Sequence, residues 1–90
     1  MVTEDFCFEV PLTVEYATIS ATFAKVAEEL QSEVSIKISP RDIYQKKDDV
    51  KQVTNRVVYT PKHASLTDAQ IKLYKTKFIA AMRKRDGNLV

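Results

Sequence analysis

The sequence has one glycine, one cysteine and one histidine in 90 residues, and it has no tryptophan. A single glycine, Gly87, excludes the glycine-rich loops that bind nucleotide phosphates, because their fingerprints need several glycines. A single cysteine, Cys7, excludes an intrachain disulfide, and with one histidine a metal cluster is not expected. No stretch approaches the length of about 20 apolar residues that a membrane helix requires. Few cysteines and no signal-like apolar run favour a cytoplasmic location.

The composition is otherwise that of an ordinary globular domain, with 44% hydrophobic and 29% charged residues. A chain of 90 residues is expected to form one domain, residues 1–90, around one modest core. The formal net charge of +2 permits nucleic-acid binding, but it is too small to argue for it alone.

Hydrophobic periodicity predicts the order of secondary-structure elements. The expected elements are a strand at 5–10, a helix at 16–31, strands at 34–38 and 50–59, a helix beginning at Thr67, and a short edge strand at 88–90. This order predicts an α+β protein with the ferredoxin-like split βαβ topology (β-α-β-β-α-β). In that topology two helices cover one face of an antiparallel sheet, and the other face stays open.

The second strand is expected to be irregular around Pro40. Apolar residues fall at even positions up to Ile38, but the next apolar residue, Ile43, has an odd number. Successive residues of a strand point to opposite faces, so a bulge or a break is expected at 39–41. If Ile43 faces the core, Asp42 and Tyr44 both face the open side of the sheet.

The last helix carries the clearest local signals. Thr67 and Gln70 have the spacing of a capping box, and Leu66 and Ile71 can form the hydrophobic staple around it. Gly87 stands where a helix C-terminus favours a residue in the left-handed conformation. We therefore predict a capped helix that ends just before Gly87.

Four side chains are expected to share the open sheet face: Asp42, Tyr44, Gln52 and Arg56. An exposed tyrosine offers a platform on which an unpaired base can stack. A neighbouring carboxylate can accept hydrogen bonds from a base amino group, and arginine can bind phosphates or base edges. The set suits a short single-stranded RNA loop. The alternative is a cross-strand packing pair surrounded by ordinary surface residues.

The other polar residues do not indicate a catalytic site, because the sequence shows no nucleophile paired with a general base. His63 is interpreted as a surface histidine or an RNA-phosphate contact, and Asp48 and Asp49 as a solvated turn. Cys7 is interpreted as a small strand residue. A basic cluster on the last helix is either its solvated face or a track for phosphates. It comprises Lys72, Lys75, Lys77, Arg83, Lys84 and Arg85.

Three segments carry a resemblance to a known family. They are D-I-Y-Q at 42–45, the run at 51–71 that contains S-L-T-D, and A-A-M-R-K-R-D-G-N-L at 80–89. Together they resemble the ferredoxin-fold anticodon-binding domain found at the C-terminus of the bacterial phenylalanyl-tRNA synthetase beta subunit. The chain differs from the family pattern at Lys46, where a glycine is usual, and at Gln52, where a serine is usual.

The resemblance implies that Tyr44 stacks on an anticodon base and that Asp42 hydrogen-bonds to the anticodon. Gln52 would take the position of the family serine, and Arg56 matches the arginine of the third strand. The implied function is binding of the phenylalanine tRNA anticodon loop, without a cofactor, as a non-catalytic part of phenylalanine-tRNA ligase. The expected partners are tRNA, the rest of the beta chain and the alpha subunit.

Two points follow for the identity of the chain. The catalytic module does not fit into 90 residues, so the chain is expected to be a fragment of a larger protein. The alternative function is a stand-alone ferredoxin-like domain for protein interaction or scaffolding, without RNA binding.

Overall fold

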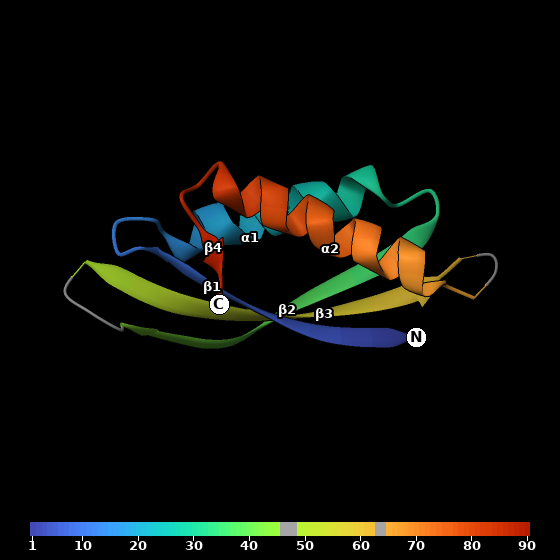
Figure 1. Ribbon diagram of the computed structural model, residues 1–90, viewed down its shortest axis with the longest axis horizontal. Coiled ribbons are helices and arrows are strands. Elements are labelled where there is room, and N and C mark those ends of the chain that lie inside the picture. The colour runs from blue at the N-terminus through green and yellow to red at the C-terminus, as the bar shows by residue number, and fades with distance from the viewer. Residues whose placement is uncertain (46–48, 63–64) are drawn as a thin grey trace.

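The computed structural model describes residues 1–45, 49–62 and 65–90. The elements follow the order β1 (Val2–Pro11), α1 (Tyr16–Glu29), β2 (Val34–Gln45), β3 (Val50–Pro61), α2 (Asp68–Arg83) and β4 (Asn88–Leu89). Over the described residues they form an α+β fold whose antiparallel sheet has the strand order β2-β3-β1-β4. Both helices lie on one face of this sheet (Figure 1). The arrangement is compatible with a ferredoxin-like fold. Asp48 and His63 lie outside the described residues.

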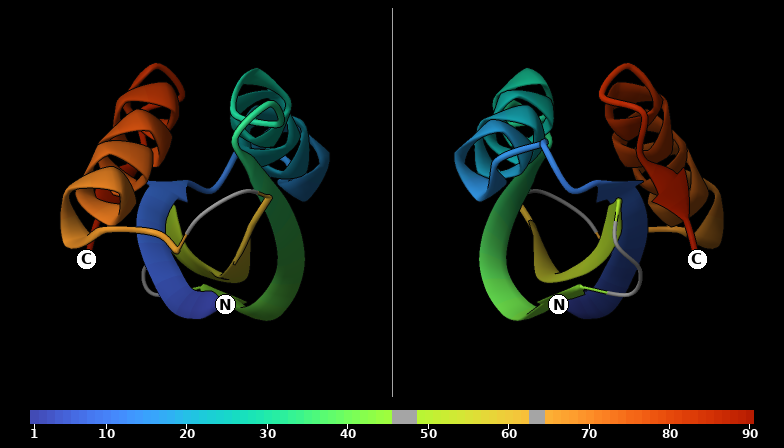
Figure 2. Two further views of the ribbon diagram at one scale, coloured as in Figure 1. Left: turned by 90° about the vertical axis from the view of Figure 1, so that its right-hand side faces the viewer. Right: turned by 90° about the vertical axis from the view of Figure 1, so that its left-hand side faces the viewer.

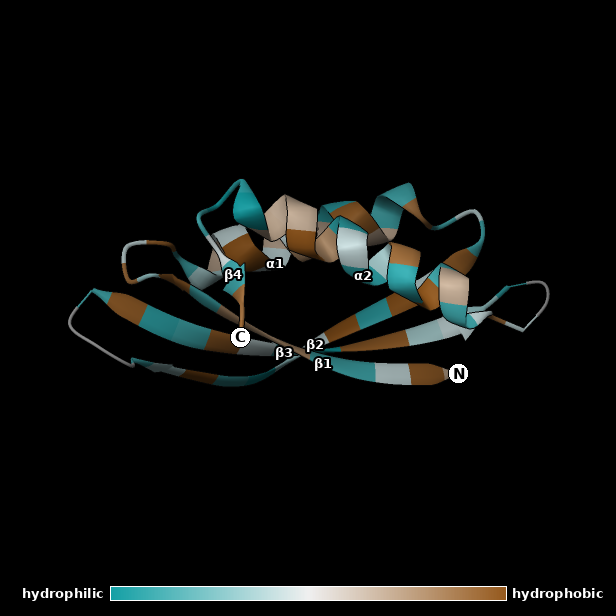
Figure 3. Cartoon of the chain, in the orientation of Figure 1, coloured by the Kyte–Doolittle hydropathy of each residue, from teal (hydrophilic) through white to brown (hydrophobic). Residues whose placement is uncertain are grey.

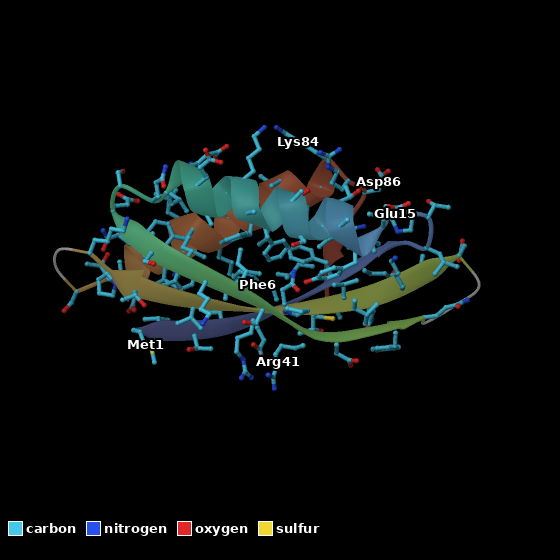
Figure 4. All side chains as sticks on the ribbon, turned by 180° about the vertical axis from the view of Figure 1, so that it is seen from behind. Met1, Phe6, Glu15, Arg41, Lys84 and Asp86 are labelled. Atoms are coloured by element: carbon cyan, nitrogen blue, oxygen red, sulfur yellow. The ribbon has the colours of Figure 1, made fainter. Side chains whose placement is uncertain are left out.

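The core lies between the sheet and the helices. Hydrophobic and hydrophilic residues alternate along the strands (Figure 3), and the apolar side faces the helices. Phe6 of β1 points into this layer (Figure 4) and lies 5.6 Å from Phe78 of α2 between ring centroids. Phe78 in turn lies 5.0 Å from Phe23 of α1. Aromatic rings therefore join both helices to the central strands.

The expected irregularity in β2 is present as a register shift against β3 between Pro40 and Asp42. The strand is not broken there, because pairing with β3 continues to Gln45. Beyond the shift Ile43 pairs with Val53, which belongs to the core side, so Asp42 and Tyr44 face the open side. Ile43 is still 47% exposed, since the β2–β3 end of the sheet extends past the helices (Figure 1).

The start of α2 is capped as predicted. The Thr67 hydroxyl accepts a hydrogen bond from the Gln70 amide at 3.2 Å, and the Gln70 side-chain oxygen accepts one from the Thr67 amide at 2.8 Å. This pair satisfies two of the amides that a helix start leaves without a partner. Leu66 and Ile71 both pack against the core, which agrees with the expected staple.

The end of α2 corrects one prediction. The residue with a left-handed backbone is Asp86, with φ of 60°, and Gly87 does not have a positive φ. Gly87 is instead buried by close packing, because a Cβ atom there would lie 3.1 Å from Met82 Cε and 3.2 Å from Val10 Cγ1. Asp tolerates the left-handed region better than most residues, so the chain needs no glycine for the turn itself.

The sheet is strongly curved when it is seen along its length, and both helices lie above its concave side (Figure 2). The opposite face of β1, β2 and β3 is left uncovered by helices (Figures 1 and 2). Among the described residues, no helix is long and apolar enough to cross a membrane.

Candidate nucleic-acid interface

Cross-strand pairing brings three of the predicted site residues to neighbouring places on the open face. One row of directly paired residues crosses the whole sheet and consists of Tyr44, Gln52, Glu9 and Asn88. The next row consists of Asp42, Thr54 and Cys7. Asp42 and Tyr44 therefore lie side by side at the end of β2, as the parity of the strand predicted. Cys7 shares their face, opposite to the core phenylalanines.

Tyr44 is the exposed aromatic residue of this face. It is 49% exposed, and its hydroxyl donates a hydrogen bond to Gln52 Oε1 on the neighbouring strand. The bond restricts rotation of the ring, while half of the residue remains accessible. A ring that is both fixed and accessible suits base stacking, because little conformational entropy is lost on binding.

Gln52 lies in a more buried position than the sequence suggested. Only 7% of it is exposed, and its Oε1 atom accepts from the Tyr44 hydroxyl and, at 3.9 Å, from Cys7 Sγ. Its carboxamide oxygen is therefore engaged within the sheet. In this arrangement Gln52 positions Tyr44 and does not present its oxygen to a ligand.

Arg56 is held by a carboxylate that the sequence interpretation did not pair with it. Asp5 lies directly opposite on β1, and it accepts from Arg56 Nε at 2.9 Å and from Nη2 at 3.2 Å. Hydrogen bonding by Arg56 lowers the pKa of Asp5, and the positive charges of Arg56 and Arg41 act in the same direction. The same pairing raises the pKa of Arg56. This two-point contact fixes the plane of the guanidinium.

Arg41 is a second cation that the sequence interpretation passed over as part of the strand irregularity. It lies at the register shift, is exposed, and projects from the side of the sheet away from the helices (Figure 4). Its charge reaches Asp5, so Arg41 and Arg56 belong to the same part of the open face. The contact between Asp5 and Arg56 could have been predicted from the antiparallel pairing of β1 with β3, which places the two residues directly opposite each other.

The Asp5–Arg56 pair predicts a pH-dependent contribution to stability. The pKa of Asp5 is lowered in the folded state, so the pair stabilises the fold above the unfolded value of about 3.9 and loses this effect as the pH falls through the folded value. Asp5→Asn should therefore lower the urea midpoint at pH 6 and leave it close to that of the native protein at pH 2.5. An equal difference at both pH values would contradict an electrostatic origin. Because both side chains are well exposed, the effect is expected to be small.

Metal ligation receives no support from the described residues, among which no group of three or more His, Cys, Asp or Glu side chains is placed to hold a metal ion. The open face instead combines an aromatic ring held by a hydrogen bond, an exposed carboxylate and two arginines. Comparison of the sequence with models of protein families and with curated proteins finds no match.

Proposed function

We propose that the chain is a ferredoxin-like anticodon-binding domain that binds the anticodon loop of phenylalanine tRNA through its open sheet face. It would act as a non-catalytic part of a phenylalanyl-tRNA synthetase beta chain. The observation that carries the proposal is the half-exposed Tyr44, whose hydroxyl is fixed by Gln52 and which lies next to Asp42. The resemblance at 42–45 and 51–71 supplies the identity of the RNA.

Each side chain has a distinct role in this proposal. The ring of Tyr44 stacks on an unpaired base, and the Asp42 carboxylate accepts hydrogen bonds from a base amino or imino group. Arg56 donates two of its N–H groups to the Asp5 carboxylate. A guanidinium has five N–H groups, so the others remain for a phosphate or a base edge. Arg41 adds a second cation to the same surface.

Substitution of Tyr44 tests the proposal. Tyr44→Ala should weaken binding of a phenylalanine tRNA anticodon stem-loop by about 1–3 kcal/mol, because it removes the stacking surface. Tyr44→Phe is the matched control, since it keeps the ring and loses only the hydrogen bond to Gln52, so its effect should be much smaller. Fluorescence anisotropy with labelled RNA at low salt measures both, because the small net charge gives little electrostatic help.

Two outcomes would overturn the assignment. Unchanged RNA binding in both Tyr44→Ala and Asp42→Ala would exclude this face as the RNA site. Equal affinity for stem-loops with other anticodons would exclude selective recognition of phenylalanine tRNA. A stable dimer that buries Tyr44 and shows no RNA binding would favour the scaffold function.

A further inference from the structure

A groove runs along the outer side of the helix layer, between α1 and α2, on the side of the molecule away from the candidate RNA interface. Its volume is about 520 Å³. Its floor is formed by the buried residues of the lining, Thr22 and Val26 of α1, beside the small side chains Ala21, Ala80 and Ala81. Short side chains on both helices leave this space unfilled, so the floor offers an apolar surface to a ligand.

The rim of this groove is strongly basic. It carries Lys25 of α1, Lys77 of α2, and Lys84 and Arg85 just after α2, with Glu29 as the one carboxylate in the lining. Four cations and one carboxylate give a net charge of +3, which exceeds the net charge of +2 of the whole chain. The groove therefore concentrates the positive charge of the protein, and such a concentration attracts acidic partners.

The four cations are available to a partner. Within residues 1–45, 49–62 and 65–90, none of them takes part in an ion pair. Lys84 extends outward from the helix layer (Figure 4). Three further cations of the basic cluster, Lys72, Lys75 and Arg83, do not line the groove, so the grouping depends on position and not on helix composition alone.

We propose that this groove binds a short acidic amphipathic helix from a partner protein. An apolar floor between basic rims matches a helix that has one apolar face and carboxylates beside it. On α1 the lining extends from Ala21 to Glu29, nine residues that rise by about 12 Å, which accommodates about two turns of a docked helix. An RNA strand would use the basic rim but would leave the apolar floor without a function.

The proposal is independent of RNA binding, because the groove and the open sheet face lie on opposite sides of the molecule. The binding test uses a labelled synthetic helical peptide of about three turns. Leucine forms its apolar face, and glutamate occupies the remaining positions. Its counterpart carries glutamine at every glutamate position. Fluorescence anisotropy with the full chain should show binding of the acidic helix, weakening as salt is raised, and much weaker binding of the glutamine helix.

Charge reversal inside and outside the groove provides the matched comparison. Lys77→Glu should weaken binding of the acidic helix about fivefold or more. Lys72→Glu makes the same change of charge on the same helix outside the groove and should have a clearly smaller effect. Ala80→Gln, which places a larger side chain in the groove without changing charge, should also weaken binding of the acidic helix, whereas Tyr44→Ala should leave that binding unchanged.

Four results with the helix probes would overturn the proposal. They are no binding of the acidic helix at protein concentrations up to about 1 mM, equal binding of both helices, equal effects of Lys77→Glu and Lys72→Glu, and no effect of Ala80→Gln. Loss of RNA stem-loop binding in Lys77→Glu to the same degree as in Tyr44→Ala would assign the groove to phosphates and also overturn it.

Discussion

Replacement of Phe78 with alanine is expected to lower the free energy of unfolding by about 3–5 kcal/mol. Phe78 is 1% exposed, and its ring lies against Phe23 of α1 and Phe6 of β1. Phe78 thus packs α2 against both the other helix and the sheet. The loss is a large fraction of the total of about 5–15 kcal/mol that holds a typical domain folded.

Urea denaturation followed by circular dichroism measures this effect, and α2 itself supplies the control. Leu73 lies on the same helix but is 52% exposed, so Leu73→Ala should change the free energy of unfolding by no more than about 0.5 kcal/mol. Similar losses in the two variants would mean that α2 does not present Phe78 to the core.

The sequence was sufficient to predict the elements and the side of each strand that faces the core. The alternation in β1 and the capping box at Thr67 are local signals, and both the strand and the box are present. The parity change between Ile38 and Ile43 is also local, and it correctly located the irregularity in β2. Such signals are informative because a strand with one buried face allows only one register.

The features that escaped prediction depend on contacts between different secondary-structure elements. Asp5 and Arg56 are 51 positions apart, and their pairing follows only from the register of β1 against β3. The burial of Gln52 depends on where the Tyr44 side chain lies. Gly87 was predicted to be the left-handed residue that ends the last helix. Its role is instead to let the end of α2 pack closely against Val10. In each case packing, and not local propensity, determines the outcome.

The two proposed binding surfaces lie on opposite faces of the molecule and differ in their chemistry. The open sheet face presents Tyr44 and Asp42 with nearby arginines, whereas the helix layer presents an apolar floor between basic rims. Since helices cover one side of the sheet and leave the other free, the proposed RNA site and the proposed helix site would not overlap. Rigid packing through Phe78 would keep the two surfaces in a constant relation.

A pH-dependent loss of stability is the expected result of Asn55→Asp. Asn55 lies on the core side of β3 and is 1% exposed. Its Oδ1 atom accepts from the Tyr16 hydroxyl at 2.9 Å, whereas its Nδ2 atom has no partner among the described residues. A carboxylate in this place would thus have a single protein donor and little water, so burial would strongly disfavour its charged form.

The sign of the effect follows from the direction of that pKa change. Burial raises the pKa of the introduced carboxyl group in the folded state above the unfolded value of about 3.9. The neutral acid resembles the native amide in size, so the variant should be close to native stability below about pH 4. As the pH increases above about 4, the free energy of unfolding should fall until the pH reaches the folded-state pKa. If burial raises that pKa by about 3 units, the variant would lose about 4 kcal/mol of stability at pH 7.

Urea midpoints at pH 4 and pH 7 test this expectation against a control on the same strand. Thr60→Asp introduces the same group at an exposed position of β3, so its difference from the native protein should not grow between the two pH values. If the difference in urea midpoint between Asn55→Asp and the native protein also stayed the same at both pH values, water or a cation would have to reach position 55. A difference that grows only for Asn55→Asp would show that the contact between Tyr16 and Asn55 is sealed within the core, where α1 joins the sheet.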